Sequence, residues 1–181
     1  MALPEFTFLG DAVWLDFVNS ARGREPAPPD LLPDAAAFER WARALHLEVN
    51  GTEPTFGALR RFRNQLTELA EALHQGLQLP AAAIETVNDI LSRTPGNHQL
   101  TRIGGEWRLR FAPTRMLTAI ETIARSAAAT LADPQVAVRR CAGENCSLFF
   151  IDASPNRSRL WCSPSFCGRH ARIERRRGLL R

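Results

Sequence analysis

All four cysteines of this 181-residue chain lie in one short segment near its C-terminus. They are Cys141, Cys146, Cys162 and Cys167, in the spacing C-x4-C-x15-C-x4-C. Thiolates act as nucleophiles, as disulfide partners and as soft metal ligands. Residues 1–140 contain no cysteine, so any thiol chemistry of this protein is confined to that segment.

Three uses of four clustered cysteines compete: a structural zinc site, two disulfides, or an iron–sulfur cluster. Two close pairs separated by a short hairpin are typical of tetrahedral zinc sites, whereas iron–sulfur motifs usually have tighter spacings. Disulfides are disfavoured in a reducing cytoplasm. We expect that compartment because no signal peptide and no membrane-spanning apolar run is visible. We therefore predict one structural Zn²⁺ per chain bound by all four cysteines.

The residues around the cysteines predict a particular zinc fold. Gly143 and Asn145 permit the tight turn of a zinc knuckle, and the segment "SLFFID" is expected to form a short strand. Ser163 is a candidate helix N-cap with Pro164 at the first helical position, which places Cys167 in the first helical turn. A knuckle, a hairpin and a helix in this order form a treble-clef-like finger. A module of about 40 residues with so few apolar side chains would depend on the metal for its folding energy.

The distribution of charge along the chain also changes close to the start of the cysteine segment. Residues 1–138 hold 13 arginines against 16 acidic residues, and residues 139–181 hold 10 arginines against three. A basic surface on a fixed scaffold can bind nucleic-acid phosphates, although a solvated basic tail is the simpler explanation. Arg169, Arg172 and Arg176 fall on one face of the predicted last helix. The ten basic residues are Arg139, Arg140, Arg157, Arg159, Arg169, Arg172, Arg175, Arg176, Arg177 and Arg181.

The body, residues 1–138, is expected to be mainly helical with one β-hairpin, so that the fold class is α+β. Apolar residues recur at helical spacing in several segments, and an alternating pattern flanks the Gly104-Gly105 turn. We expect helices over about 13–21, 33–45, 54–76, 80–93 and 113–133, a hairpin over 98–113, and a strand in "QVAVRR" leading into the finger, residues 139–181.

Residues 141–177 resemble the CGNR zinc-finger family. The name-giving motif departs from that pattern, because "CGRH" stands where the family has "CGNR". The body resembles the ABATE domain that usually precedes this finger, through "FLGDAVWLDFVNS" and "LRRFR". The resemblance implies a bacterial stress-induced transcription regulator whose finger contacts DNA. The positions that match the finger's pattern are Cys141, Cys146, Phe150, Asp152, Asn156, Arg157, Arg159, Trp161, Cys162, Ser163, Cys167 and Gly168.

The body offers one further candidate site. Asp16 and Asn19, spaced i and i+3, could face Arg60 or Arg63. They would form either a ligand pocket or, as we favour, an ion pair between two helices. We find no Walker loop, nucleophile elbow or Rossmann glycine pattern and expect no enzymatic activity.

Two functions remain. The first is a zinc-containing, DNA-binding transcription regulator in the cytoplasm, without membrane association. Its body would serve for sensing or dimerisation, which leaves room for a homodimer and a small-molecule effector. The alternative is a zinc-stapled protein-interaction module without sequence-specific DNA binding. The expected DNA contacts are Arg157, Arg159, Arg169, Arg172 and Arg176.

Overall fold

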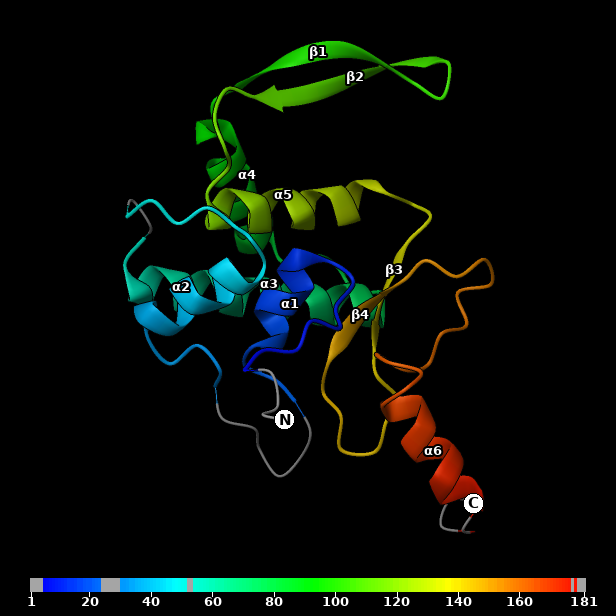
Figure 1. The fold of residues 1–181 in the computed structure, drawn as a ribbon. Coiled ribbons are helices and arrows are strands. Elements are labelled where there is room, and N and C mark those ends of the chain that lie inside the picture. The colour runs from blue at the N-terminus through cyan, green and yellow to red at the C-terminus, as the bar shows by residue number, and fades with distance from the viewer. Residues whose placement is uncertain (1–4, 24–29, 52–53, 177, 179–181) are drawn as a thin grey trace.

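The computed structural model describes residues 5–23, 30–51, 54–176 and 178, and it confirms an α+β fold with a helical body and a C-terminal finger (Figure 1). None of the described helices is both long and apolar enough to cross a lipid bilayer. In chain order the elements are α1 (Val13–Asn19), α2 (Ala35–Ala44), α3 (Phe56–Gln75), α4 (Ala81–Arg93), β1 (Gly96–Ile103), β2 (Glu106–Pro113), α5 (Ala119–Ala132), β3 (Ala137–Arg140), β4 (Phe149–Asp152) and α6 (Cys167–Arg176).

The core of the body forms around α1, whose seven residues are almost all buried. Helix α1 packs between α3 and α5, and α4 covers the other side of these two helices. The Phe17 ring lies 5.8 Å from Phe38 and 5.6 Å from Trp41, centroid to centroid. On the opposite side Trp14 donates a hydrogen bond from Nε1 to the Thr130 hydroxyl at 3.0 Å. This aromatic cluster explains how a helix of two turns becomes the centre of the body.

Local capping decides where α5 begins. We expected the helix to start at Pro113, but this expectation is wrong, because Pro113 ends strand β2. The helix begins instead after Thr118, whose hydroxyl accepts a hydrogen bond from the Glu121 backbone N–H. The Glu121 carboxylate in turn accepts one from the Thr118 N–H at 2.9 Å. This reciprocal capping box satisfies two N–H groups that would otherwise be unpaired.

Strands β1 and β2 form a long antiparallel hairpin, called here the arm (residues 96–113). Their register pairs Gly96 with Pro113 and Ile103 with Glu106. Gly104 and Gly105 make the turn with φ of 58° and 90°, values that favour glycine in both positions. The arm stands away from the helical body, above α5 in Figure 1. Almost all of its side chains are exposed.

Strands β3 and β4 form a second, shorter antiparallel pair between the body and the cysteine segment. Strand β4 contributes side chains to two separate cores, because successive side chains of a strand point to opposite faces. Phe149 and Ile151 join the core of the body together with Val138 from β3. Phe150 lies in the small core formed with the four cysteines. The finger is thus packed against the body through its own sheet.

Candidate metal centre

The four cysteine sulfur atoms converge on one point. Their Sγ atoms all lie within 4.8 Å of one another, and all four residues are buried and free of disulfides. The Sγ atoms of Cys162 and Cys167 are 3.5 Å apart, and those of Cys146 and Cys162 are 4.0 Å apart. A tetrahedron with Zn–S bonds of about 2.3 Å places its sulfur atoms about 3.8 Å apart. The cluster therefore has the size of a four-sulfur zinc site.

The first pair lies on a knuckle that follows β3. Asn145 has a left-handed φ of 60°, and the Cys146 N–H donates to the Gly143 carbonyl at 3.0 Å. A Cβ on Gly143 would lie 3.2 Å from the Cys167 Cβ, so the close approach of the two pairs favours glycine. The Cys141 sulfur accepts backbone N–H groups from Gly143 at 3.4 Å and from Cys162 at 3.3 Å. These contacts stabilise a thiolate.

The second pair lies at the start of α6. The Ser163 hydroxyl accepts the Phe166 N–H at 3.2 Å, as expected for an N-cap. The expectation that Pro164 is the first helical residue is wrong, because residues 164–166 form a turn and the α-helix begins at Cys167. Gly168 allows the chain to pass Trp161, because a Cβ there would lie 3.0 Å from the indole ring. The helix that carries the basic residues thus starts at a metal ligand.

The electrostatics of the cluster favour a cation. Hydrogen bonds from Cys146 and Cys162 lower the pKa of Cys141, and hydrogen bonds to Cys141 and Cys146 raise the pKa of Cys162. Burial raises the pKa of Cys167. Four adjacent buried thiols cannot all ionise unless a positive charge lies between them, and zinc supplies that charge to soft sulfur donors. The cluster fits one structural Zn²⁺ per chain, with no ligand position open for water.

A buried carboxylate holds the loop that joins the two pairs. Burial by itself would raise the pKa of Asp152, but hydrogen bonds from Ser154 and Arg159 outweigh it and lower the pKa. Ser154 donates its hydroxyl at 2.6 Å and its N–H at 3.0 Å, and the Arg159 N–H donates at 3.1 Å. The Arg139 guanidinium lies 3.3 Å from the carboxylate. Asp152 is therefore a structural anion, and the structure explains its place in the finger's pattern.

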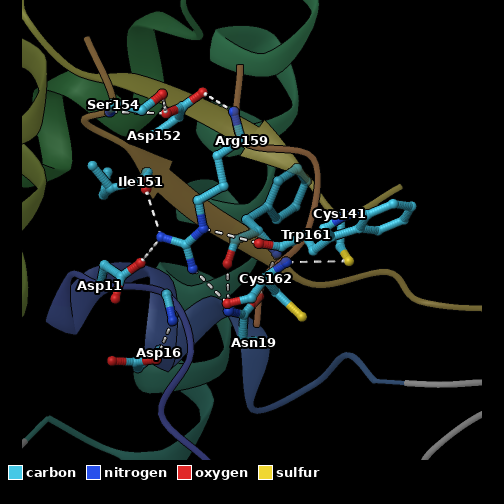
Figure 2. A network of polar contacts seen from close by, with 12 residues as sticks. Asp11, Asp16, Asn19, Cys141, Ile151, Asp152, Ser154, Arg159, Trp161 and Cys162 are labelled. Carbon is cyan, nitrogen blue, oxygen red and sulfur yellow. Dashed lines mark hydrogen bonds and ion pairs between the residues drawn. The ribbon is translucent and has the colours of Figure 1, made fainter. Parts of the chain in front are cut away.

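Arg159 is the centre of the network in Figure 2, where it lies between the finger and the N-terminal part of the body. Its guanidinium donates hydrogen bonds to the carbonyls of Trp161 and Cys162 and forms an ion pair with Asp11. It also lies 4.4 Å from the centroid of the Phe150 ring, a cation–π distance. Sequence reasoning offered Arg159 as a DNA contact, whereas the structure uses its guanidinium to fasten the second cysteine pair.

Asp16 and Asn19 also have partners other than those expected. The Asn19 side chain donates to the Phe149 carbonyl at 2.8 Å and accepts its N–H at 2.9 Å, so it pairs with β4 like a neighbouring strand. Asp16 accepts the Gly10 N–H at 2.8 Å, and the Gly10 carbonyl accepts the Ile151 N–H at 2.9 Å. Both residues therefore connect α1 with the finger's sheet, as Figure 2 shows for their side chains.

Arg60 and Arg63 lie on α3 and do not meet Asp16 or Asn19 in an ion pair among the described residues. Arg63 forms its ion pair with Asp30 and donates to the Ser20 hydroxyl at 2.9 Å. The two arginines line an apolar crevice with about 10 Å³ of free volume, which is room for about one water molecule. Among the described residues these four form neither the ion pair between two helices that we favoured nor the alternative ligand pocket.

The remaining basic candidates differ in how far the protein itself uses them. The Arg157 guanidinium donates to the Pro134 carbonyl. On α6, Arg169, Arg172 and Arg176 are exposed, and the Arg172 guanidinium donates to the Pro164 carbonyl at 3.2 Å. Across residues 5–23, 30–51, 54–176 and 178, none of these three forms an ion pair with a carboxylate. Arg177 and Arg181 lie outside the described residues.

Comparison with known families matches both parts of the chain. Residues 11–134 match the ABATE family model, described as "Putative stress-induced transcription regulator". Residues 137–178 match the model of the CGNR zinc finger. These matches confirm the resemblance drawn from the sequence, and both families are of regulator or zinc-finger type. The comparison with curated proteins gave no match.

Proposed function

Because this chain belongs to the ABATE family and ends in a CGNR zinc finger, we propose that it is a cytoplasmic, non-enzymatic transcription regulator that binds DNA through helix α6. The single observation that carries the proposal is the position of α6. The helix begins at the zinc ligand Cys167, so the metal fixes its first turn relative to the body. Its exposed residues are predominantly arginines, which is the electrostatic footprint of nucleic-acid binding.

Three exposed arginines lie along one side of α6, and one of them, Arg172, also donates to the Pro164 carbonyl. Arg169, Arg172 and Arg176 follow one another at i, i+3 and i+7, and residues at these spacings share a helix face. The opposite face is closed to DNA, because Cys167, Gly168 and Ala171 are buried against the finger. An α-helix fits the major groove of B-DNA. We assign the main DNA contacts to these three arginines.

Arg157 and Arg159 contribute charge rather than specific contacts in this proposal. The Arg159 guanidinium is engaged by the carbonyls of Trp161 and Cys162 and by Asp11, so its donors are not available to a phosphate oxygen or a base edge. Arg157 donates to the Pro134 carbonyl and lies outside α6. Either residue still adds positive potential near α6. Replacing Arg159 would weaken DNA binding indirectly, by loosening the chain around Cys162.

Salt dependence of DNA binding tests the proposal. Fluorescence anisotropy of labelled random duplexes, measured with zinc-loaded full-length protein between 50 and 200 mM salt, gives the slope of log affinity against log salt. Each phosphate contact contributes about −0.9 to that slope. The double variant Arg172→Ala, Arg176→Ala should bind more weakly, with a slope flatter by about two units if both residues contact phosphates.

The chain offers a matched control with the same change in charge. The double variant Arg108→Ala, Arg110→Ala removes two exposed arginines from the arm, far along the chain from the finger. It should leave the salt slope unchanged. An equal loss of affinity in both double variants would show that DNA binding depends on net charge and not on the position of the arginines. Salt-independent binding, or none, together with specific capture of a protein would favour the zinc-stapled interaction module.

A further inference from the structure

The arm has one apolar and one polar face, although the sequence alternation of β1 is weak. Paired residues of an antiparallel ladder lie on the same face, so the register places three pairs together: His98 with Phe111, Leu100 with Leu109, and Arg102 with Trp107. The intervening pairs, such as Gln99 with Arg110 and Thr101 with Arg108, form the polar face.

The apolar face is uncovered over most of its length. Leu100, Leu109 and Trp107 are 69%, 67% and 68% exposed. A two-stranded hairpin alone is marginally stable in water, and large exposed apolar side chains gathered on one face mark an interaction surface. The arm nonetheless keeps eight paired positions on each strand. These exposed side chains make the face a candidate interaction surface.

A groove continues the same face at the base of the arm. It has a volume of about 570 Å³ and lies between the arm, the end of α4 and the outer side of α5. The alanines of α5 leave it wide, because they carry only a methyl group. The apolar residues that line it are Leu91, Phe111, Leu117, Ala128, Ala129 and Ala132.

We propose that this surface binds a second copy of the chain, with the two arms packed face to face across a two-fold axis. In a two-fold contact both copies use the same surface, so a residue that projects from one copy must fit a hollow of the other. That surface must therefore carry both a projection and a matching hollow. The arm provides both. Trp107 projects near the tip, and the groove lies four ladder positions away at the base. A two-fold axis through the central pair, Leu100 and Leu109, places each Trp107 in the groove of the other copy.

Size and charge support this occupant. The strands are about 27 Å long at 3.4 Å per residue, and a buried Trp contributes about 150–250 Å² by itself. A stable interface buries roughly 800 Å² per partner, so each copy must contribute its groove as well as its arm to reach that size. Arg102 is the only charged residue among the three pairs of the face, while Arg108 and Arg110 point away from it. The three pairs contain no carboxylate, and the Arg102 guanidinium must remain at the solvated edge of the contact, because burying an unpaired charge is costly.

Sedimentation equilibrium of zinc-loaded full-length protein tests the surface. The wild-type chain should dimerise reversibly, and Trp107→Ala should raise the dissociation constant about 30-fold, the scale of an interface hot spot. Arg108→Ser, which changes the polar face of the same strand, should leave it unchanged. A dimer equally strong in Trp107→Ala uses another surface and would overturn the proposal. A wild-type monomer at 200 µM would do so as well.

Cross-linking locates the axis independently of affinity. Leu109→Cys should form an intermolecular disulfide under mild oxidation of the zinc-loaded protein, because the central pair meets its own copy. Leu77→Cys, 60% exposed at the end of α3, should not.

A monomeric disulfide in the double variant Leu109→Cys, Ala129→Cys would instead show the arm closing on its own α5. A monomer whose groove binds 1-anilinonaphthalene-8-sulfonate would assign the surface to a small apolar ligand. Either result would exclude the dimer contact, and neither depends on whether the protein binds DNA.

Discussion

The molecule contains two hairpin sheets with opposite surroundings. The arm, β1–β2, has eight paired positions and is exposed on both faces. The pair β3–β4 has four positions, yet every residue of β4 is buried. The number of paired positions therefore does not decide which of the two sheets is packed into the protein. The difference lies in what covers the two faces.

Each face of β4 has its own partner. Phe149 and Ile151 pack into the body, and Phe150 packs against the cysteines and within cation–π distance of Arg159. The hydrogen bonds of Asn19 to Phe149 then close one edge of the sheet. The arm meets the described part of the body at its base, where His98 and Phe111 line the groove beside α5. We expect the short sheet to depend on the metal and the body, and the arm to depend on a partner chain.

Loss of the metal should have the largest effect. Cys162→Ser, or removal of zinc with a chelator, should unfold residues from about 139 onward while the helical body and the arm remain folded. Zinc binding supplies about 10–16 kcal/mol to folding in zinc-finger peptides, far more than any single side chain here. Hydrogen exchange should show protection lost in β3, β4 and α6 and kept in α1 to α5.

The same experiment tests the boundary near residue 138. Limited proteolysis of Cys162→Ser should remove roughly the C-terminal 40 residues, the part that depends on the metal. Because Phe149 and Ile151 belong to the core of the body, the remaining body should also unfold at lower denaturant. Cooperative unfolding of the whole chain would show that body and finger form one unit.

Phe149→Ala should have the next largest effect. Phe149 is fully buried between the body and the finger, and Phe→Ala substitutions in cores cost about 3–5 kcal/mol. Denaturant unfolding of the zinc-loaded protein measures this change. Trp107→Ala in the arm, measured at dilution where the chain is monomeric, serves as the control. A similar loss in both variants would contradict the contrast between the two sheets.

Asp16 should make stability depend on pH because its carboxyl group is buried. Burial raises the pKa of Asp16 from 3.8 to about 6, against the opposing hydrogen bonds from Gly10 and Leu9. Between pH 4 and 6 the folded state therefore binds more protons than the unfolded chain, and stability falls as pH rises through this range. At neutral pH the cost is at most about 3 kcal/mol, from about 1.4 kcal/mol for each pKa unit.

Asp16→Asn should remove that pH dependence. An asparagine oxygen can still accept the Gly10 N–H, so the variant should be more stable than wild type at pH 7 and nearly equal to it at pH 4. Thermal unfolding of both proteins at pH 4, 5, 6 and 7 measures the difference. Asn88→Asp, on exposed α4, is a control for changing charge alone. A constant difference at all four pH values would contradict the assignment to Asp16.

Leu109→Thr should have the smallest effect on folding. Leu109 is two-thirds exposed, threonine has high β-propensity, and exposed substitutions usually change stability by less than about 0.5 kcal/mol. The free energy of unfolding of the dilute monomer should therefore barely change. A loss above about 2 kcal/mol would show that the arm packs against its own body.

The sequence by itself determined the zinc ligands, the main helices and both hairpins. These features depend on spacing along the chain: cysteine pairs close enough for one knuckle each, apolar residues at helical period, and glycines at a turn. The helix after Ser163 was also predicted, although it begins at Cys167 and not at Pro164. The start of α5 was missed because the sequence carries two signals for a helix start, Pro113 and the capping box at Thr118. The choice between them depended on where strand β2 ends.

Only the tertiary structure decided which polar residues meet. Asp16 and Arg63 have opposite charges at plausible positions, but Arg63 binds Asp30, and Asp16 binds the backbone that supports β4. Arg159 was expected to contact DNA, but folding places its guanidinium between Asp11 and the carbonyl of Cys162. The long-range partners of polar side chains leave no periodic pattern in the sequence, because any arginine can bond to any acceptor that the fold brings within about 3 Å.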